Sequence, residues 1–67
     1  MYYAIEQLID GKWERTHLCV AESRAAAMIF ASRDGFVFNA RLRLRPYKPA
    51  TAELAMLPVR FGTYKRV

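Results

Sequence analysis

The sequence is poor in cysteine and in acidic residues, and it has no long apolar segment. Its single cysteine, Cys19, cannot form an intramolecular disulfide, which excludes the disulfide-stapled class of small secreted domains and favours a reducing cytoplasm. The longest uncharged stretch, residues 25–32, is far shorter than the roughly 20 residues that a membrane-spanning helix requires. Glu6 and Asp10 also interrupt any signal-peptide core, so we expect a cytoplasmic protein without a membrane partner.

Groups that carry out catalysis or bind metal ions are scarce as well. His17 and Cys19 alternate on one expected strand, but zinc needs four ligands and no second cluster of ligand residues exists. A thiol nucleophile needs a base that a third group orients, and no third group is placed to do so. The glycines, Gly11, Gly35 and Gly62, are isolated and form no phosphate-binding loop. We therefore predict no enzymatic activity, no cofactor and no metal site.

The chain is short but rich in apolar residues. Its 67 residues are 54% hydrophobic, a composition typical of a folded domain rather than of a disordered basic tail. A domain of this size buries only about 60% of the surface that its unfolded chain exposes. Residues 1–67 are therefore predicted to form a single domain with one thin core, which a homodimer contact would help to stabilise.

Basic charge is concentrated in the second half of the chain. Residues 1–34 carry four Lys or Arg against five Asp or Glu, whereas residues 35–67 carry seven against one. Eight of the eleven basic residues are arginine, whose planar guanidinium pairs with phosphate or carboxylate and stacks on aromatic rings. A polyanion or an acidic protein surface is therefore a candidate partner. The alternative is that the arginines merely keep an exposed strand face polar.

The N-terminal part has the pattern of a β-hairpin. Residues 2–9 and 13–20 are rich in aromatic and β-branched side chains, and Asp10-Gly11 between them favours a type I′ turn. A two-residue turn makes Glu6 face Arg15, an oppositely charged cross-strand pair that supports this register. A three-residue turn with a bulge remains the alternative, and it would move the side chains of one strand to the other face.

A helix is predicted over residues 24–33. Ser23 is a suitable N-cap residue, and Gly35 offers a left-handed stop just beyond the helix. The apolar stripe of this helix is expected to pack in the core, and it consists of Ala26, Ile29 and Phe30, flanked by Ala25 and Met28.

The remainder of the chain completes a sheet. Residues 36–45 alternate between apolar and polar side chains, which predicts a third strand. Pro46 and Pro49 then take the chain out of the sheet, and a short helix over residues 52–57 and a final strand over residues 59–67 follow. The predicted fold is α+β: a small antiparallel-rich four-stranded sheet with one main helix packed on one face, in the order ββαβ, short α, β.

Strand alternation assigns these residues to two faces of the sheet. The face beneath the helix is expected to form the core with Tyr3, Ile5, Ile9, Leu18, Val20, Phe36, Phe38, Leu42, Leu44 and Phe61, packed against Ile29 and Phe30. The open face is expected to interleave arginines with aromatic rings. Its candidate binding residues are Trp13, Arg15, Arg41, Arg43, Arg45, Arg60, Tyr64 and Arg66, with Tyr2, Leu8 and His17 beside them.

Two kinds of ligand suit such a face. Alternate residues of a strand lie about 6.6 to 6.8 Å apart, comparable to successive phosphates of a nucleic-acid strand, and exposed rings stack on unpaired bases. Trp, Tyr and Arg are equally the residues most enriched at the energetic centres of protein interfaces. The sequence therefore leaves open a host protein or ribonucleoprotein complex and a direct DNA or RNA ligand.

The layout resembles a family of small phage-encoded proteins. The hairpin over residues 2–13 and the capped helix that starts within residues 22–27 are similar to the single-domain proteins of bacteriophages and mobile elements, including anti-CRISPR proteins. The resemblance implies a cytosolic, non-enzymatic inhibitor that blocks a host nucleic-acid machine. Many anti-CRISPR proteins are acidic, whereas this chain is basic, so DNA mimicry is not implied. A sequence-tolerant nucleic-acid-binding module and a small structural subunit remain the alternatives.

Overall fold

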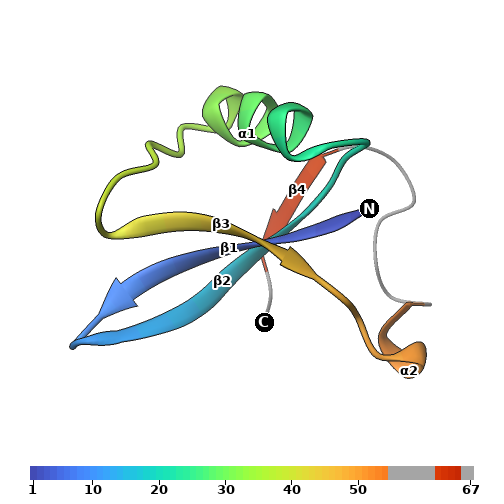
Figure 1. The fold of residues 1–67 in the computed structure, drawn as a ribbon, viewed down its shortest axis with the longest axis horizontal. Coiled ribbons are helices and arrows are strands. Elements are labelled where there is room, and N and C mark those ends of the chain that lie inside the picture. The colour runs from blue at the N-terminus through green and yellow to red at the C-terminus, as the bar shows by residue number, and fades with distance from the viewer. Residues whose placement is uncertain (55–61, 66–67) are drawn as a thin grey trace.

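The computed structural model describes residues 1–54 and 62–65, which form one twisted sheet with a helix packed against one side of it (Figure 1). The elements are β1 (Tyr2–Ile9), β2 (Lys12–Val20), α1 (Arg24–Arg33), β3 (Leu42–Tyr47), α2 (Thr51–Leu54) and β4 (Gly62–Lys65). The strand order is β3-β1-β2-β4, and neighbouring strands are antiparallel. The predicted α+β class is confirmed. Among the described residues, no helix has both the length and the apolar character needed to cross a bilayer.

The hairpin turn forms where the sequence predicts it. Asp10 and Gly11 have φ angles of 51° and 77°, the two positive values that a type I′ turn requires. The register pairs Ile9 with Lys12 and Glu6 with Arg15, so the prediction of a two-residue turn is confirmed.

A β-bulge between Ile5 and Glu6 corrects the assignment of faces in β2. Thr16 is the extra residue there, and its Oγ1 donates a hydrogen bond of 3.3 Å to the carbonyl oxygen of Ile5. Beyond the bulge Tyr3 pairs with Cys19, so Cys19 lies beneath α1. The prediction that Leu18 is part of that core is therefore wrong.

The other β2 residues past the bulge change faces for the same reason. Val20 lies on the same face of β2 as Leu18, the face away from α1. His17, expected on the open face, instead lies beneath α1 with its ring centroid 4.8 Å from that of Phe36. One inserted residue moves every later side chain of the strand to the opposite face of the sheet.

Local signals define α1 at both ends. The backbone N–H of Ala26 donates to Ser23 Oγ at 3.1 Å, as an N-cap requires. At the C-terminus, the N–H of Phe36 bonds to the carbonyl of Ala31 and the N–H of Gly35 to that of Ser32. These two bonds form a Schellman motif, and the predicted helix of residues 24–33 is confirmed.

The buried side of α1 differs from the predicted stripe. Ala27 and Ala31 are fully buried, whereas Ile29 is 56% exposed, so the assignment of Ile29 to the core is wrong. Alanine methyl groups let the helix approach the sheet closely, and a branched side chain would not fit there. Phe30 and Met28 flank the contact and are partly buried. The buried core beneath α1 consists of Tyr3, Ile5, Cys19, Ala21, Ala27, Ala31 and Leu44.

The third strand begins later than predicted. Residues 36–41 form a loop, and Asn39 and Leu42 exchange backbone hydrogen bonds of 3.1 and 3.4 Å that close a tight turn before β3. Phe36 and Phe38 still pack against the core, so their alternation reflects burial from a loop. Ile9, also assigned to the core, is 37% exposed at the hairpin tip.

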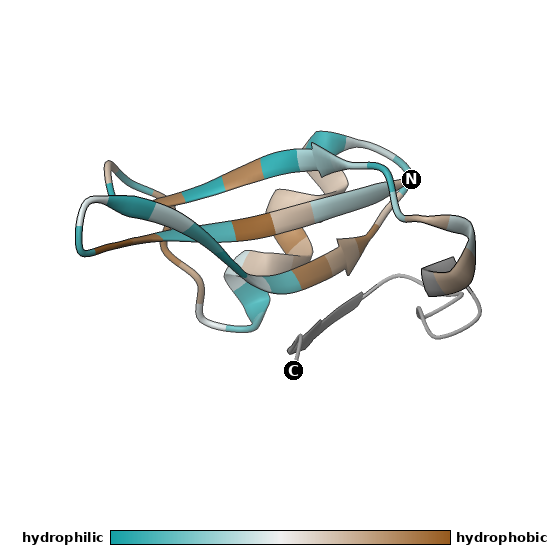
Figure 2. Ribbon diagram, turned by 90° about the horizontal axis from the view of Figure 1, so that it is seen from below, coloured by the Kyte–Doolittle hydropathy of each residue, from teal (hydrophilic) through white to brown (hydrophobic). Residues whose placement is uncertain are grey.

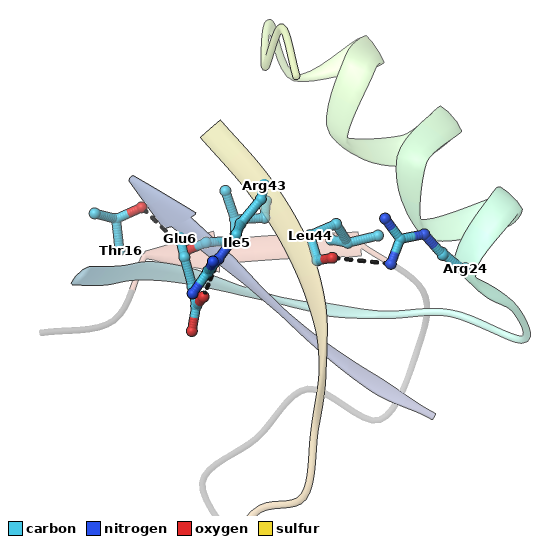
Figure 3. A network of polar contacts seen from close by, with 6 residues as sticks. All are labelled: Ile5, Glu6, Thr16, Arg24, Arg43 and Leu44. Carbon is cyan, nitrogen blue, oxygen red and sulfur yellow. Dashed lines mark hydrogen bonds and ion pairs between the residues drawn. The ribbon is translucent and has the colours of Figure 1, made fainter. Parts of the chain in front are cut away.

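β3 lies at the edge of the sheet and is protected there. Arg24 at the start of α1 donates a hydrogen bond of 3.0 Å from Nη1 to the carbonyl oxygen of Leu44 (Figure 3). Pro46 lies within β3, and an edge strand tolerates its missing N–H donor. Both features oppose pairing with a further strand.

The C-terminal predictions are covered in part by the described residues. The short helix expected over residues 52–57 is seen as Thr51–Leu54, and the strand expected over residues 59–67 is seen as Gly62–Lys65. The predictions for Arg60, Phe61 and Arg66 lie outside the described residues.

Replacing Gly35 by alanine should destabilise the domain by about 1 to 2 kcal/mol, because a Cβ at the observed φ of 94° is strained although space around it is open. Gly35→Asn should cost less, since asparagine tolerates left-handed backbone better than alanine does. Urea unfolding of the three proteins measures the difference. Equal stability of Gly35→Ala and the parent chain would contradict the Schellman assignment.

Candidate functional site

The candidate site is the face of the sheet opposite α1. Figure 2 views the molecule from the side of this face, with α1 behind the strands. The strand registers bring Glu6 of β1 opposite Arg15 of β2 and opposite Arg43 of β3. Alternate residues of a strand lie on the same face of the sheet. This face therefore also carries three further cross-strand pairs: Leu8 with Trp13, Ala4 with Arg45, and Tyr2 with Tyr47. We name this surface the arginine face, and it comprises Glu6, Trp13, Arg15, Arg43, Arg45 and Tyr47.

The Arg43 guanidinium is held from two sides. Its Nε donates to Glu6 Oε1 at 2.7 Å (Figure 3), and its Cζ lies 3.9 Å from the centroid of the Trp13 ring. Both ion-pair partners are partly exposed, with 33% and 23% of their side-chain surfaces accessible. A guanidinium has five N–H donors, and the contact with Glu6 uses the one on Nε. Among the described residues, no hydrogen bond to the terminal nitrogens of Arg43 is found, so these donors are available to a ligand.

Arg15 makes a second stack in the opposite direction. Its Cζ lies 4.4 Å from the centroid of the Tyr47 ring, so Arg15 of β2 reaches across β1 to β3 while Arg43 of β3 reaches across β1 to β2. By the strand registers, the Arg15 contact with Tyr47 passes over Ala4 of β1, which has a small side chain. Guanidinium groups stacked on rings keep their N–H edges for ligands. The arginine face therefore carries two pre-positioned donors for phosphate or carboxylate.

Not every residue of this face is polar. Ala4 and Leu18 are buried on it, packed by the partly buried rings of Tyr2 and Tyr47. This second apolar cluster forms because the bulge turns Leu18 toward this side. It anchors Tyr47, whose ring in turn supports Arg15.

The charge of the arginine face is positive. Among the described side chains of this face, Glu6 is the one carboxylate that balances Arg15, Arg43 and Arg45. Glu14 pairs with Gln7 and therefore lies on the other face of the sheet, the face that α1 covers. Arg45 is exposed and adds an unstacked cation at the same edge. An anion that approaches this face meets cations on β2 and β3, the two strands that flank β1.

The predicted binding residues are placed as follows. The structure brings Trp13, Arg15, Arg43 and Arg45 together on one face. Arg41 is wrongly assigned to the strand: it lies in the turn before β3, where its N–H donates to Asn39 Oδ1 at 2.7 Å. Arg60 and Arg66 lie outside the described residues, and Tyr64 is placed by its pairing with Leu18 in β4.

Sequence reasoning missed two members of the site. The sequence pairs Glu6 with Arg15 but gives no sign of its contact with Arg43, and Pro46 predicts that the strand ends before Tyr47. The usable signal was the edge-strand tolerance for proline, since the alternation Arg43, Arg45, Tyr47 continues through Pro46.

His17 and Cys19 do not form a reactive pair. Cys19 is fully buried, and its Sγ donates to the carbonyl of Ala27 at 3.8 Å. Burial, and secondarily the negative charge of Asp34, raises the pKa of the Cys19 thiol, which disfavours the nucleophilic thiolate. His17 Nδ1 lies 3.0 Å from Thr16 Oγ1. In residues 1–54 and 62–65, no three histidine, cysteine or carboxylate side chains gather where they could hold a metal ion.

Comparison of the chain with protein-family models, with curated proteins and with solved structures finds no match.

Proposed function

We propose that this protein is a small, non-enzymatic binding protein that docks on a nucleic-acid-associated complex of a host cell through the arginine face. The observation that carries the proposal is the pair of stacks that span β1, Arg43 on Trp13 and Arg15 on Tyr47. Stacked arginines lose less conformational freedom on binding than flexible ones. A face of this kind suits a densely anionic, phosphate-bearing surface.

The inhibitor role and the cytoplasmic location belong to the same proposal. The resemblance in layout to anti-CRISPR-type proteins of phages implies blockade of a host nucleic-acid machine. A free, buried Cys19 suits a reducing compartment. In this mechanism the arginine face covers the anionic, phosphate-bearing surface of the partner and excludes other ligands by steric overlap, without any chemical step.

A pull-down from bacterial lysate, with and without nuclease, tests the proposal. Capture that survives nuclease and is lost in an Arg43→Glu, Arg45→Glu variant supports docking on a protein component through this face. The matched control is Lys12→Glu with Arg33→Glu, which makes the same charge change at exposed positions outside the arginine face. Capture that is equal for all three proteins would overturn the proposal.

Direct nucleic-acid binding is the second candidate, favoured by the N–H donors that both stacked arginines present. Each neutralised phosphate contributes about −0.9 to the slope of log affinity against log salt on duplex DNA and about −0.7 on a single strand. Three arginines therefore predict a slope of about −2 to −3 in a mobility-shift assay. Absence of any shift at low salt would exclude this candidate.

The remaining alternatives, a structural subunit and a homodimer, are less well served by this face. Glu6 already pairs with Arg43 within the chain, and Glu14 lies on the opposite face of the sheet. Two arginine faces brought together would therefore place cations against cations. A mass measurement that shows a stable homo-oligomer would favour these alternatives.

Glu6→Gln should raise the affinity for a fluorescent oligo(dT) strand by about two- to fivefold, because it removes the only carboxylate among the named residues of the face and frees Arg43 Nε. Glu14→Gln makes the same charge change on the opposite face of the sheet and should raise the affinity less. Fluorescence anisotropy at fixed salt measures both. A lower affinity for Glu6→Gln would mean that the ion pair positions Arg43 rather than competing for it.

A further inference from the structure

A cavity adjoins the arginine face at the end where β1 begins and β3 ends. It is a shallow hollow of about 350 Å³, open to solvent, and is lined by Met1, Tyr2, Pro46, Tyr47, Lys48 and Pro49. Tyr2 and Tyr47 are cross-strand partners, so two phenol rings stand side by side in its wall. Tyr47 belongs to both the cavity and the arginine face.

The lining combines flat apolar rings with one cation. Two tyrosines, two prolines and a methionine supply ring and thioether surface, Lys48 supplies an ammonium group, and none of the six lining residues is acidic. Ligand pockets generally begin at about 300 Å³, so the space suits a single ring system rather than a folded segment of a partner.

Two cations of the arginine face lie beside this cavity. The Arg15 guanidinium lies over the ring of Tyr47 at 4.4 Å, and Arg45 lies two residues before Tyr47 on the same face of β3. A ligand that fills the cavity and continues onto the arginine face therefore needs an apolar ring flanked by negative charges. An unpaired nucleobase between two phosphates has that chemistry.

We propose that the cavity takes one unpaired nucleobase of a nucleic-acid single strand whose phosphates lie along the arginine face. This inference rests on the proposed function, because it assigns the part of the nucleic-acid-associated partner that the face contacts. The base stacks against the tyrosine rings, and Lys48, Arg15 and Arg45 contact the adjacent phosphates. Base–aromatic stacking is tolerant of sequence, so no strong base preference is expected.

The test compares two ligands of equal charge by NMR titration of the isotopically labelled protein. One ligand is a five-nucleotide oligo(dT), and the other is the same backbone with abasic sites. We expect oligo(dT) to bind about tenfold more tightly and to shift the amide signals of Tyr2 and Tyr47. The abasic chain should shift mainly the signals of Arg15, Arg43 and Arg45.

Equal affinities, with no base-dependent shifts at the cavity, would overturn the nucleobase assignment while leaving the proposed function intact. An acidic peptide with a central phenylalanine that shifts the cavity signals when oligo(dT) does not would also overturn it, in favour of a protein ligand. Lysate capture that is equal for the unaltered protein and the Arg43→Glu, Arg45→Glu variant would instead count against the proposed function itself.

Side-chain variants separate stacking from charge. Tyr2→Leu retains apolar contact with Ala4 and Leu18 but removes one ring, so it should lower oligo(dT) affinity toward that of the abasic chain and leave abasic binding unchanged. Tyr2→Phe keeps the ring and should retain the tenfold preference. Loss of binding to both ligands in Tyr2→Leu with an intact circular-dichroism spectrum would contradict a stacking role.

Discussion

Reversing two charges, Arg43→Glu and Arg45→Glu, is expected to weaken partner binding by at least a hundredfold. The pair places two carboxylates where an anionic ligand would lie, one of them beside Glu6 and next to the ring of Trp13. Arg43 is partly buried and Arg45 is exposed, and at both positions the lost contact and the new repulsion act within the screening length of about 8 Å at physiological salt. The measurement is the dissociation constant for the captured partner or for oligo(dT).

The control variant separates local contacts from net charge. Lys12→Glu with Arg33→Glu changes the net charge by the same amount at exposed positions away from the face. At physiological salt the screening length is about 8 Å, so this control should bind within a few-fold of the parent chain. Similar losses in both variants would show that overall charge, rather than the arginine face, governs binding.

Truncation of Ile5 to alanine is expected to cost about 2 to 5 kcal/mol, because Ile5 is fully buried in the core beneath α1. For a domain of this length each kcal/mol lowers the melting temperature by about 4 to 8 °C. The variant should therefore melt at least 8 °C below the parent chain, and it will be largely unfolded if the parent stability is near the lower end for small domains.

Ile29→Ala is the matched comparison, since it makes the same chemical change at a side chain that is 56% exposed. Its cost should stay within about 0.5 kcal/mol, helped by the higher helix propensity of alanine. Thermal melts followed by circular dichroism measure both variants. A large loss for Ile29→Ala would restore the apolar stripe predicted from the sequence and contradict the observed orientation of α1.

The elements that sequence reasoning placed correctly are those controlled by local interactions. Asp10-Gly11 closes the hairpin, and Ser23 and Gly35 bound α1, because each of these signals acts over a few bonds of backbone. The β3 prediction started too early because residues 36–41 bury alternate side chains from a loop. Periodicity records burial, and a loop beside a core produces the same pattern as a strand.

The candidate site was predicted in composition but not in arrangement. Trp13, Arg15, Arg43 and Arg45 were assigned to one face, and the registers bring them together. The pairing of particular cations with particular rings, and the contributions of Glu6 and Tyr47, depend on contacts across β1. Such contacts join residues 30 to 37 positions apart, and no local pattern encodes them.

By itself, therefore, the sequence determined the turn, the capped helix, the excess of arginine and the α+β class, all of which follow from backbone preference and composition. Only the tertiary structure decided the bulge at Thr16, the face on which Leu18 and Cys19 lie, and the side of α1 that is buried. The physical reason is that a one-residue insertion costs little locally, yet the packing of the whole sheet decides whether it occurs.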